Sequence, residues 1–161
     1  GIRIGALVTR NREVISTAMK FAQARLSPPS MGQVIAEALL DTPTEFLQKS
    51  AAEYKARRDY IIPALNEIKG VHSPMPDGAF YSMVELPVDD VDKFSRWLLE
   101  EFEYEGATVM LAPGTGFYTG KKLGVHQVRI AYVLEMDKLQ KAVRCLKKAL
   151  SVYPGRTIDQ D

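Results

Sequence analysis

Cysteine and histidine are scarce in this chain, and neither is placed where it would carry chemistry. The single cysteine, Cys145, cannot form a disulfide within the chain, and it falls among Val143, Leu146 and Leu150 in a helix-like segment. A free cysteine in such a position is typical of a small buried residue in a reducing compartment, so we expect a cytoplasmic protein. His72 and His126 stand far apart, without cysteines or carboxylates at ligand spacing. No metal site is expected.

Long apolar runs and an excess of positive charge are also missing. No stretch approaches the roughly 20 apolar residues that cross a bilayer, so membrane insertion is not expected. Twenty-one Lys and Arg against 20 Asp and Glu leave a net charge of +1, whereas nucleic-acid-binding domains are usually strongly basic. Nucleic acid is therefore not an expected partner. The first residues contain neither methionine nor a signal-peptide pattern, and we expect the chain to begin within a longer protein.

The apolar spacing is that of a mixed helix-and-sheet protein. A composition of 46% apolar and 25% charged residues over 161 positions suits one globular domain, or a small domain with part of another. Pro63 lies inside one expected helix and should bend it, because proline lacks the amide hydrogen. The spacing predicts strands at residues 4–9, 79–86, 108–111 and 128–133, and helices at 13–26, 31–40, 46–68, 91–105 and 138–152.

These elements divide the chain into four segments and give an α/β fold class. Residues 1–42 combine a strand with two helices, and residues 43–69 form one long helix. Residues 70–155 alternate strands and helices, which predicts a small α+β domain with a sheet covered by helices. Residues 156–161 are polar and are expected to be loose.

Two arginines beside apolar strand residues are candidates for anion binding. Arg3 lies between two isoleucines, and Arg129 lies in a strand between Val128 and Ile130. In both places the guanidinium either points to solvent, as most arginines do, or presents its planar fork to a fixed anion. The residue types alone leave both alternatives open.

Three polar segments have structural explanations as well as functional ones. Pro76-Asp77-Gly78-Ala79-Phe80-Tyr81 is typical of a turn that leads into a strand. The stretch 111–118, Leu-Ala-Pro-Gly-Thr-Gly-Phe-Tyr, can cradle an anion with its amides or simply reverse the chain. Arg57-Arg58, with Asp59 beside it, is most often a solvated helix face.

Taken in order, these segments resemble the class I and II aminotransferases, the fold type I pyridoxal-phosphate enzymes that include aspartate aminotransferase. Each motif is weak alone, but their shared order over nearly the whole chain is hard to produce by chance. The matching segments are Gly1-Ile2-Arg3-Ile4-Gly5 (G-x-R-x-G), Ser27-Pro28-Pro29-Ser30 followed by Gln33, Arg57-Arg58-Asp59, Pro76 to Tyr81 (P-x-G-A-F-Y), Pro113-Gly114 to Phe117 (P-G-x-x-F) and Val128-Arg129-Ile130-Ala131 (V-R-I-S/A).

The resemblance implies a role for each candidate arginine. Arg3 would bind the phosphate of pyridoxal phosphate, and Arg129 would bind the α-carboxylate of the substrate. Both anions suit the guanidinium fork. The implied reaction is transfer of an amino group between an amino acid and a 2-oxo acid, in amino-acid metabolism.

The resemblance also implies a domain organisation. Residues 1–42 would be the last part of a large cofactor-binding domain, and residues 43–69 a connecting helix. Residues 70–155 would be the small C-terminal domain of a homodimeric enzyme.

The chain departs from the family's pattern at the Schiff-base lysine. That lysine usually follows a serine in these enzymes, and none of the lysines here does. We expect it upstream of Gly1, so no catalytic residue is expected in these 161 residues, and the fragment alone should be inactive. Two alternatives remain open. One is another pyridoxal-phosphate reaction on the same fold, as in carbon–sulfur lyases and aminocyclopropane-carboxylate synthases, and the other is a non-enzymatic amino-acid-binding module.

Overall fold

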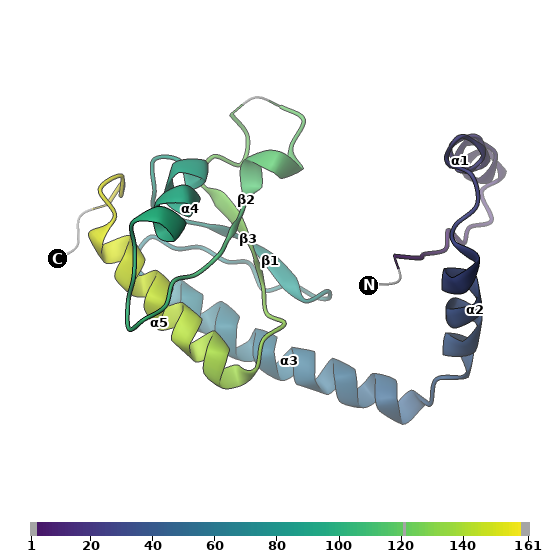
Figure 1. Ribbon diagram of the computed structural model, residues 1–161, viewed down its shortest axis with the longest axis horizontal. Coiled ribbons are helices and arrows are strands. Elements are labelled where there is room, and N and C mark those ends of the chain that lie inside the picture. The colour runs from purple at the N-terminus through teal and green to yellow at the C-terminus, as the bar shows by residue number, and fades with distance from the viewer. Residues whose placement is uncertain (1–2, 121, 159–161) are drawn as a thin grey trace. The chain divides into compact units, whose positions relative to one another are not determined.

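The structure, a computed structural model, describes residues 3–120 and 122–158 and contains two compact units, Gly1–Lys49 and Ser50–Asp161. The division falls within one long helix, α3 (Thr44–Asn66). The N-terminal unit also holds α1 (Arg12–Arg25), α2 (Ser30–Ala38) and the short three-ten helix η1 (Leu39–Asp41) (Figure 1). The C-terminal unit holds β1 (Tyr81–Glu85), α4 (Val91–Glu100), β2 (Ala112–Pro113), the three-ten helix η2 (Gly114–Phe117), β3 (Gln127–Ala131) and α5 (Met136–Val152).

The N-terminal unit consists of helices with little buried surface. The side chain of Asn11 begins α1 by accepting hydrogen bonds from the backbone amides of Glu13 and Val14, at 2.9 and 3.2 Å. The helices expected at 13–26 and 31–40 are confirmed as α1 and α2, with slightly shifted ends. Among the described residues of this unit only Gly32 is buried.

The prediction of a strand at residues 4–9 is wrong. This segment has no regular secondary structure, and Leu7 and Val8 are 57% and 90% exposed. A strand forms only when its backbone pairs with a neighbour, and the described part of the N-terminal unit contains no other strand. The apolar run alone therefore does not make one.

A three-stranded antiparallel sheet forms the centre of the C-terminal unit, in the order β1-β3-β2. The strands expected at 79–86 and 128–133 are confirmed with shorter bounds. The strand expected at 108–111 is wrong, because pairing with β3 begins only at Ala112, opposite Arg129. Residues 108–111 are not part of a strand.

The core of this unit lies between the sheet and its helices. Val84 and Val128 are paired in the sheet and have no exposed surface, so this face of the sheet is fully covered at that pair. Helix α3 is unbroken (Figure 1), although Pro63 lies inside it. Proline has no amide hydrogen, so the carbonyl of Asp59 loses its partner within the helix. Both Pro63 and Asp59 are exposed, so water can bond to that carbonyl. The helices supply Ile61, Ile62 and Leu65 from α3, Phe94 and Leu98 from α4, and Leu139, Leu146 and Leu150 from α5.

Helix α4 is shorter than the expected span of 91–105. It ends at Glu100, and the chain then turns through Glu105 and Gly106, whose φ angles are +53° and +67°. The helix ends before these residues, where Glu101 leaves the helical conformation with a φ of −128°.

Residues 156 and 157, expected to belong to a loose tail, are hydrogen-bonded. The amide of Thr157 donates to the carbonyl of Pro87 at 2.9 Å, and Val88 and Arg156 form an antiparallel bridge. Residues 159–161 lie outside the described residues. Within the described ranges, no helix combines the length and apolar character needed to cross a membrane.

Tyr153 joins this C-terminal end to the loop before α4. Its ring packs against Phe94 with the centroids 4.9 Å apart, and its hydroxyl donates to Oδ1 of Asp89 at 3.1 Å. Burial, followed by the hydrogen bond to Asp89, raises the pKa of Tyr153 to about 12. Burial opposes ionisation of Asp89 too, but hydrogen bonds from Tyr153 and Lys93 outweigh it and lower the pKa of Asp89.

The pKa of Tyr153 predicts a loss of stability at alkaline pH. An unfolded tyrosine ionises near pH 10, so the contribution of the neutral side chain is complete below that pH. It is lost as the pH rises from about 10 to about 12. Tyr153→Phe should lower the free energy of unfolding by about 1 kcal/mol at neutral pH and flatten this alkaline decline.

Urea unfolding at several pH values measures both effects. Tyr60→Phe is the matched control, because the hydroxyl of Tyr60 bonds to no described residue. If the free energy of unfolding declined equally above pH 10 in wild type and in Tyr153→Phe, the decline could not be assigned to ionisation of Tyr153.

Candidate functional site

Arg129 lies at the middle of the central strand, on the sheet face opposite the core. Its neighbours across the sheet are Met83 on β1 and Ala112 on β2. Side chains alternate between the faces of a strand, so the adjacent Val128 points into the core while Arg129 points away from it. The side chain of Arg129 is half-buried there.

Two aromatic rings flank the guanidinium of Arg129. Its central carbon lies over the rings of Tyr81 and Phe117, 5.4 and 4.9 Å from their centroids. Rings stabilise a cation through their negative faces. No described residue accepts a hydrogen bond from this guanidinium or forms an ion pair with it. The N–H groups of Arg129 are therefore available to an anion.

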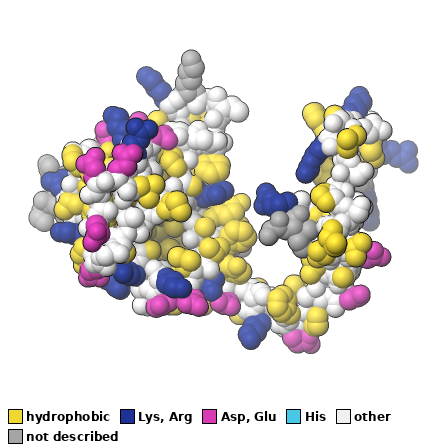
Figure 2. Space-filling view, in the orientation of Figure 1, with side chains coloured by type: hydrophobic (Ala, Val, Ile, Leu, Met, Phe, Trp, Pro, Cys, Tyr) yellow, Lys and Arg dark blue, Asp and Glu magenta, His cyan; other side chains and the backbone are white. Residues whose placement is uncertain are grey.

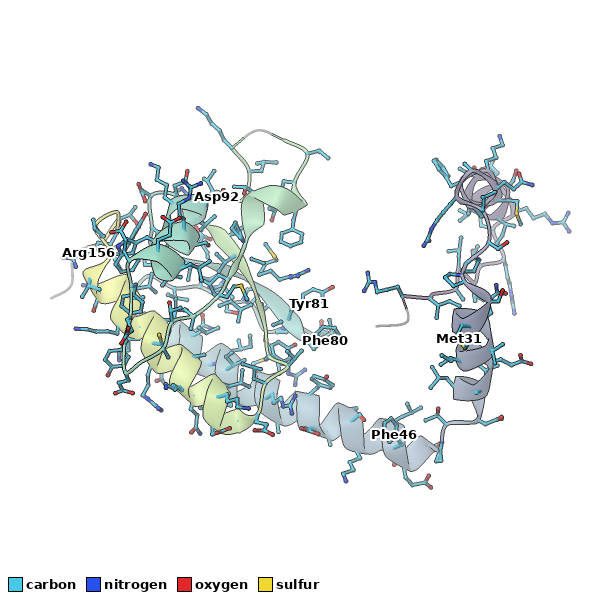
Figure 3. All side chains as sticks on the ribbon, viewed as in Figure 1. Met31, Phe46, Phe80, Tyr81, Asp92 and Arg156 are labelled. Atoms are coloured by element: carbon cyan, nitrogen blue, oxygen red, sulfur yellow. The ribbon has the colours of Figure 1, made fainter. Side chains whose placement is uncertain are left out.

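The segment 76–81 is a turn held by two hydrogen bonds from side chains elsewhere in the chain. Arg58 donates from Nη1 to the carbonyl of Pro76 at 3.1 Å, and the Tyr132 hydroxyl donates to the carbonyl of Ala79 at 3.3 Å. The turn leads into β1, as expected from the sequence. It places Phe80 and Tyr81 side by side, with ring centroids 5.6 Å apart (Figure 3).

The loop that carries Phe117 is shaped by contact between two glycine backbones. A Cβ on Gly114 would lie 2.5 Å from the carbonyl oxygen of Gln127 and 2.9 Å from that of Gly124. Gly124 itself has a φ of +72°. Of the two functions expected for this segment, the structure shows the chain reversal, and the reversal places Phe117 beside Arg129.

The expectation that Arg57 and Arg58 form a solvated helix face is wrong. Their side chains are only 12% and 23% exposed. Arg57 forms an ion pair with Glu53 and donates from Nη1 to the carbonyl of Val133 at 2.8 Å, just beyond β3. These two arginines thus connect α3 to the segments on either side of the site, a role that the sequence analysis missed.

Arg3 belongs to the N-terminal unit and is exposed. Its φ of +57° lies in the left-handed region, which residues other than glycine rarely adopt. Its guanidinium makes no hydrogen bond or ion pair with a described residue. The binding of cofactor phosphate by Arg3 therefore stays a prediction.

An apolar groove that the sequence analysis did not anticipate lies beside Arg129. It has a volume of about 670 Å³, and its walls include residues 107–112, residues 129–131 of the sheet and part of α5. Figure 2 shows hydrophobic side chains gathered on the C-terminal unit over β1 and β3. The groove includes Ile61 and α5 residues from the core side of the sheet, whereas the Arg129 guanidinium lies on the opposite face, over the rings of Tyr81 and Phe117.

Comparison with known proteins relates this chain to one enzyme family. The family model described as "Aminotransferase class I and II" matches residues 1–146. An aspartate aminotransferase from Bacillus subtilis is 30% identical over 156 residues, which cover 92% of this chain and 37% of the relative.

Solved structures give the same relation. An alanine aminotransferase from Pyrococcus furiosus superposes with a TM-score of 0.66 at 29% identity, over 86% of this chain and 35% of that one. An α-aminoadipate aminotransferase from Thermus thermophilus, complexed with N-(5'-phosphopyridoxyl)-L-leucine, gives a TM-score of 0.66 at 25% identity, over 86% and 36%.

The chain spans well under half the length of these relatives. The match nevertheless covers the motifs described above, and the neighbours confirm the expected fold type. The chain belongs to the class I and II aminotransferase family.

Proposed function

We propose that the complete enzyme containing this chain transfers an amino group between an amino acid and a 2-oxo acid, with pyridoxal phosphate as cofactor. The observation that carries this proposal is Arg129, flanked by Tyr81 and Phe117 with N–H groups that bond to no described residue. The names of the relatives support the reaction class.

Arg129 is proposed to bind the α-carboxylate of the substrate. A guanidinium meets a carboxylate with two parallel, charge-assisted hydrogen bonds, which fix the direction of the ligand as well as its place. Amino acids and 2-oxo acids share this carboxylate, so one residue can orient the substrate in both halves of the reaction. Such positioning provides much of the rate enhancement of enzymes.

Arg3 is proposed to bind the cofactor phosphate. An exposed guanidinium without a partner among the described residues fits a dianionic phosphate by charge and donor geometry. Pyridoxal phosphate, when bound, supplies the electron sink that stabilises negative charge at the substrate Cα. The base that moves the Cα proton is proposed to be a lysine outside these 161 residues, as in the family pattern.

The test is a balance of products in the complete enzyme. Aspartate, alanine and α-aminoadipate are the donors to try, because relatives are named for them. With a 2-oxo acid as acceptor, we expect one new amino acid for each donor converted to its 2-oxo acid. Release of ammonia without a new amino acid would indicate a lyase, and cofactor-independent binding of the amino acid without turnover would indicate a binding module.

We further propose a cytoplasmic homodimer. Apolar side chains such as Val8, Phe21 and Leu26 are at least 73% exposed in the N-terminal unit, and exposed apolar surface of this kind is a candidate for contact with other protein surface, a second copy of the chain included. The buried free thiol of Cys145 is compatible with a reducing compartment. Light scattering of the complete enzyme should give twice the mass of one chain, and a monomer at micromolar concentration would contradict the dimer.

A further inference from the structure

We propose that Tyr81 and Phe117 are positioning residues that orient the Arg129 guanidinium for a carboxylate ligand. The inference rests on the proposed function, in which Arg129 binds the substrate's α-carboxylate. It adds that the two rings hold this arginine in place before the ligand arrives.

The rings reach Arg129 from two separate elements. Tyr81 begins β1, two residues before Met83, which is the register partner of Arg129. Strand alternation therefore puts Tyr81 on the same sheet face as Arg129. Phe117 is the last residue of η2, and both rings lie close to the guanidinium carbon, at 5.4 and 4.9 Å.

Aromatic rings are better suited than acidic side chains to orient an arginine that must bind a carboxylate. A carboxylate beside Arg129 would occupy its N–H groups and neutralise its charge, and would thus compete with the ligand. An aromatic face attracts the cation without accepting its directional hydrogen bonds. Because the side chain is already ordered, less conformational freedom is lost when the ligand binds.

Other contacts anchor each ring. The ring of Phe80 lies 5.6 Å from that of Tyr81 and 5.8 Å from that of Tyr54 on α3. The backbone of η2 is held against the start of β3 by the close approach of Gly114 and Gly124. The two rings are therefore set by the fold and do not depend on a bound ligand.

The experiment compares variants that remove a ring with variants that keep it, in the complete enzyme with its cofactor. Phe117→Leu and Tyr81→Leu remove a ring, and Phe117→Tyr and Tyr81→Phe are the matched controls. Propanoate is the probe, because it carries a carboxylate and has no amino group to react. Its dissociation constant is measured by NMR titration, beside KM and kcat for the best amino-acid donor.

Each ring-removing variant should weaken propanoate binding by about threefold to thirtyfold, in keeping with the strength of a cation–π contact. KM should rise by a similar factor, with a smaller change in kcat. The ring-keeping variants should bind propanoate within about twofold of wild type, because they retain the aromatic face. Tyr81 and Phe117 are 41% and 50% exposed, so all four variants should fold, and circular dichroism checks this.

Variants in an Arg129→Ala background separate the two proposals. If the rings act through Arg129, removing one of them in that background should cause no further loss of propanoate binding. Two outcomes would overturn the inference and leave the proposed function standing. One is an equal loss of propanoate binding when a ring is removed in the Arg129→Ala background. The other is wild-type affinity in both ring-removing variants while Arg129→Ala binds propanoate poorly. Wild-type propanoate affinity in Arg129→Ala itself would instead overturn the carboxylate role of Arg129, and the inference with it.

Discussion

Arg129→Ala is expected to weaken substrate binding by about 2–5 kcal/mol, which corresponds to about 30-fold to about 4,000-fold in affinity. The variant removes both charge-assisted hydrogen bonds of the guanidinium fork and leaves the substrate carboxylate beside the rings of Tyr81 and Phe117 without a cationic partner. Cofactor affinity should change little, because Arg3 is the residue proposed to bind the phosphate. Titration of the complete enzyme with amino acid and with cofactor measures the two affinities separately.

Two further arginine variants serve as controls. Arg129→Lys keeps the positive charge but loses the planar fork, so its loss of affinity should be intermediate. Arg144→Ala removes an exposed arginine of α5 and should leave both affinities unchanged. If Arg129→Ala abolished cofactor binding and spared substrate binding, the roles proposed for Arg129 and Arg3 would be wrong.

Helices were predictable because their signals are local. Apolar spacing and end signals lie within one segment, so α1, α2 and α5 were predicted with small errors at their ends. Apolar runs were less reliable guides to strands, because a strand also needs a partner at the right register. Residues 4–9 and 108–111 are such runs and form no strand.

Of the candidate site, the sequence could single out only Arg129. The motif around Arg129 made it a candidate for carboxylate binding, but the contacts with Phe117 and Tyr81 depend on strand register and on the path of a loop. The hydrogen bond from Arg57 to Val133 joins residues 76 positions apart. Nothing near Arg57 in the sequence indicates such a partner, so an exposed helix face was the natural expectation.

The second prediction with a large expected effect concerns the stability of a variant at Gly114. Gly114→Ala is expected to lower the free energy of unfolding by about 3 kcal/mol, the upper part of the usual range for overpacking. The new Cβ would lie within 3.0 Å of two backbone oxygens, those of Gln127 and Gly124. Backbone atoms cannot rotate away as a side chain can, so η2 must move relative to β3.

Gly116→Ala is the matched control for this prediction, because it lies in the same short helix and a Cβ there would meet no atom within 4 Å. It should be neutral or stabilising by up to about 1 kcal/mol, since alanine restricts the unfolded chain. Urea unfolding of the two variants provides the comparison. Movement of η2 should also displace Phe117, so Gly114→Ala should weaken propanoate binding in the complete enzyme, whereas Gly116→Ala should not. Equal stability of the two variants would show that the loop yields to the added methyl group, and that the glycine contact does not fix the position of Phe117.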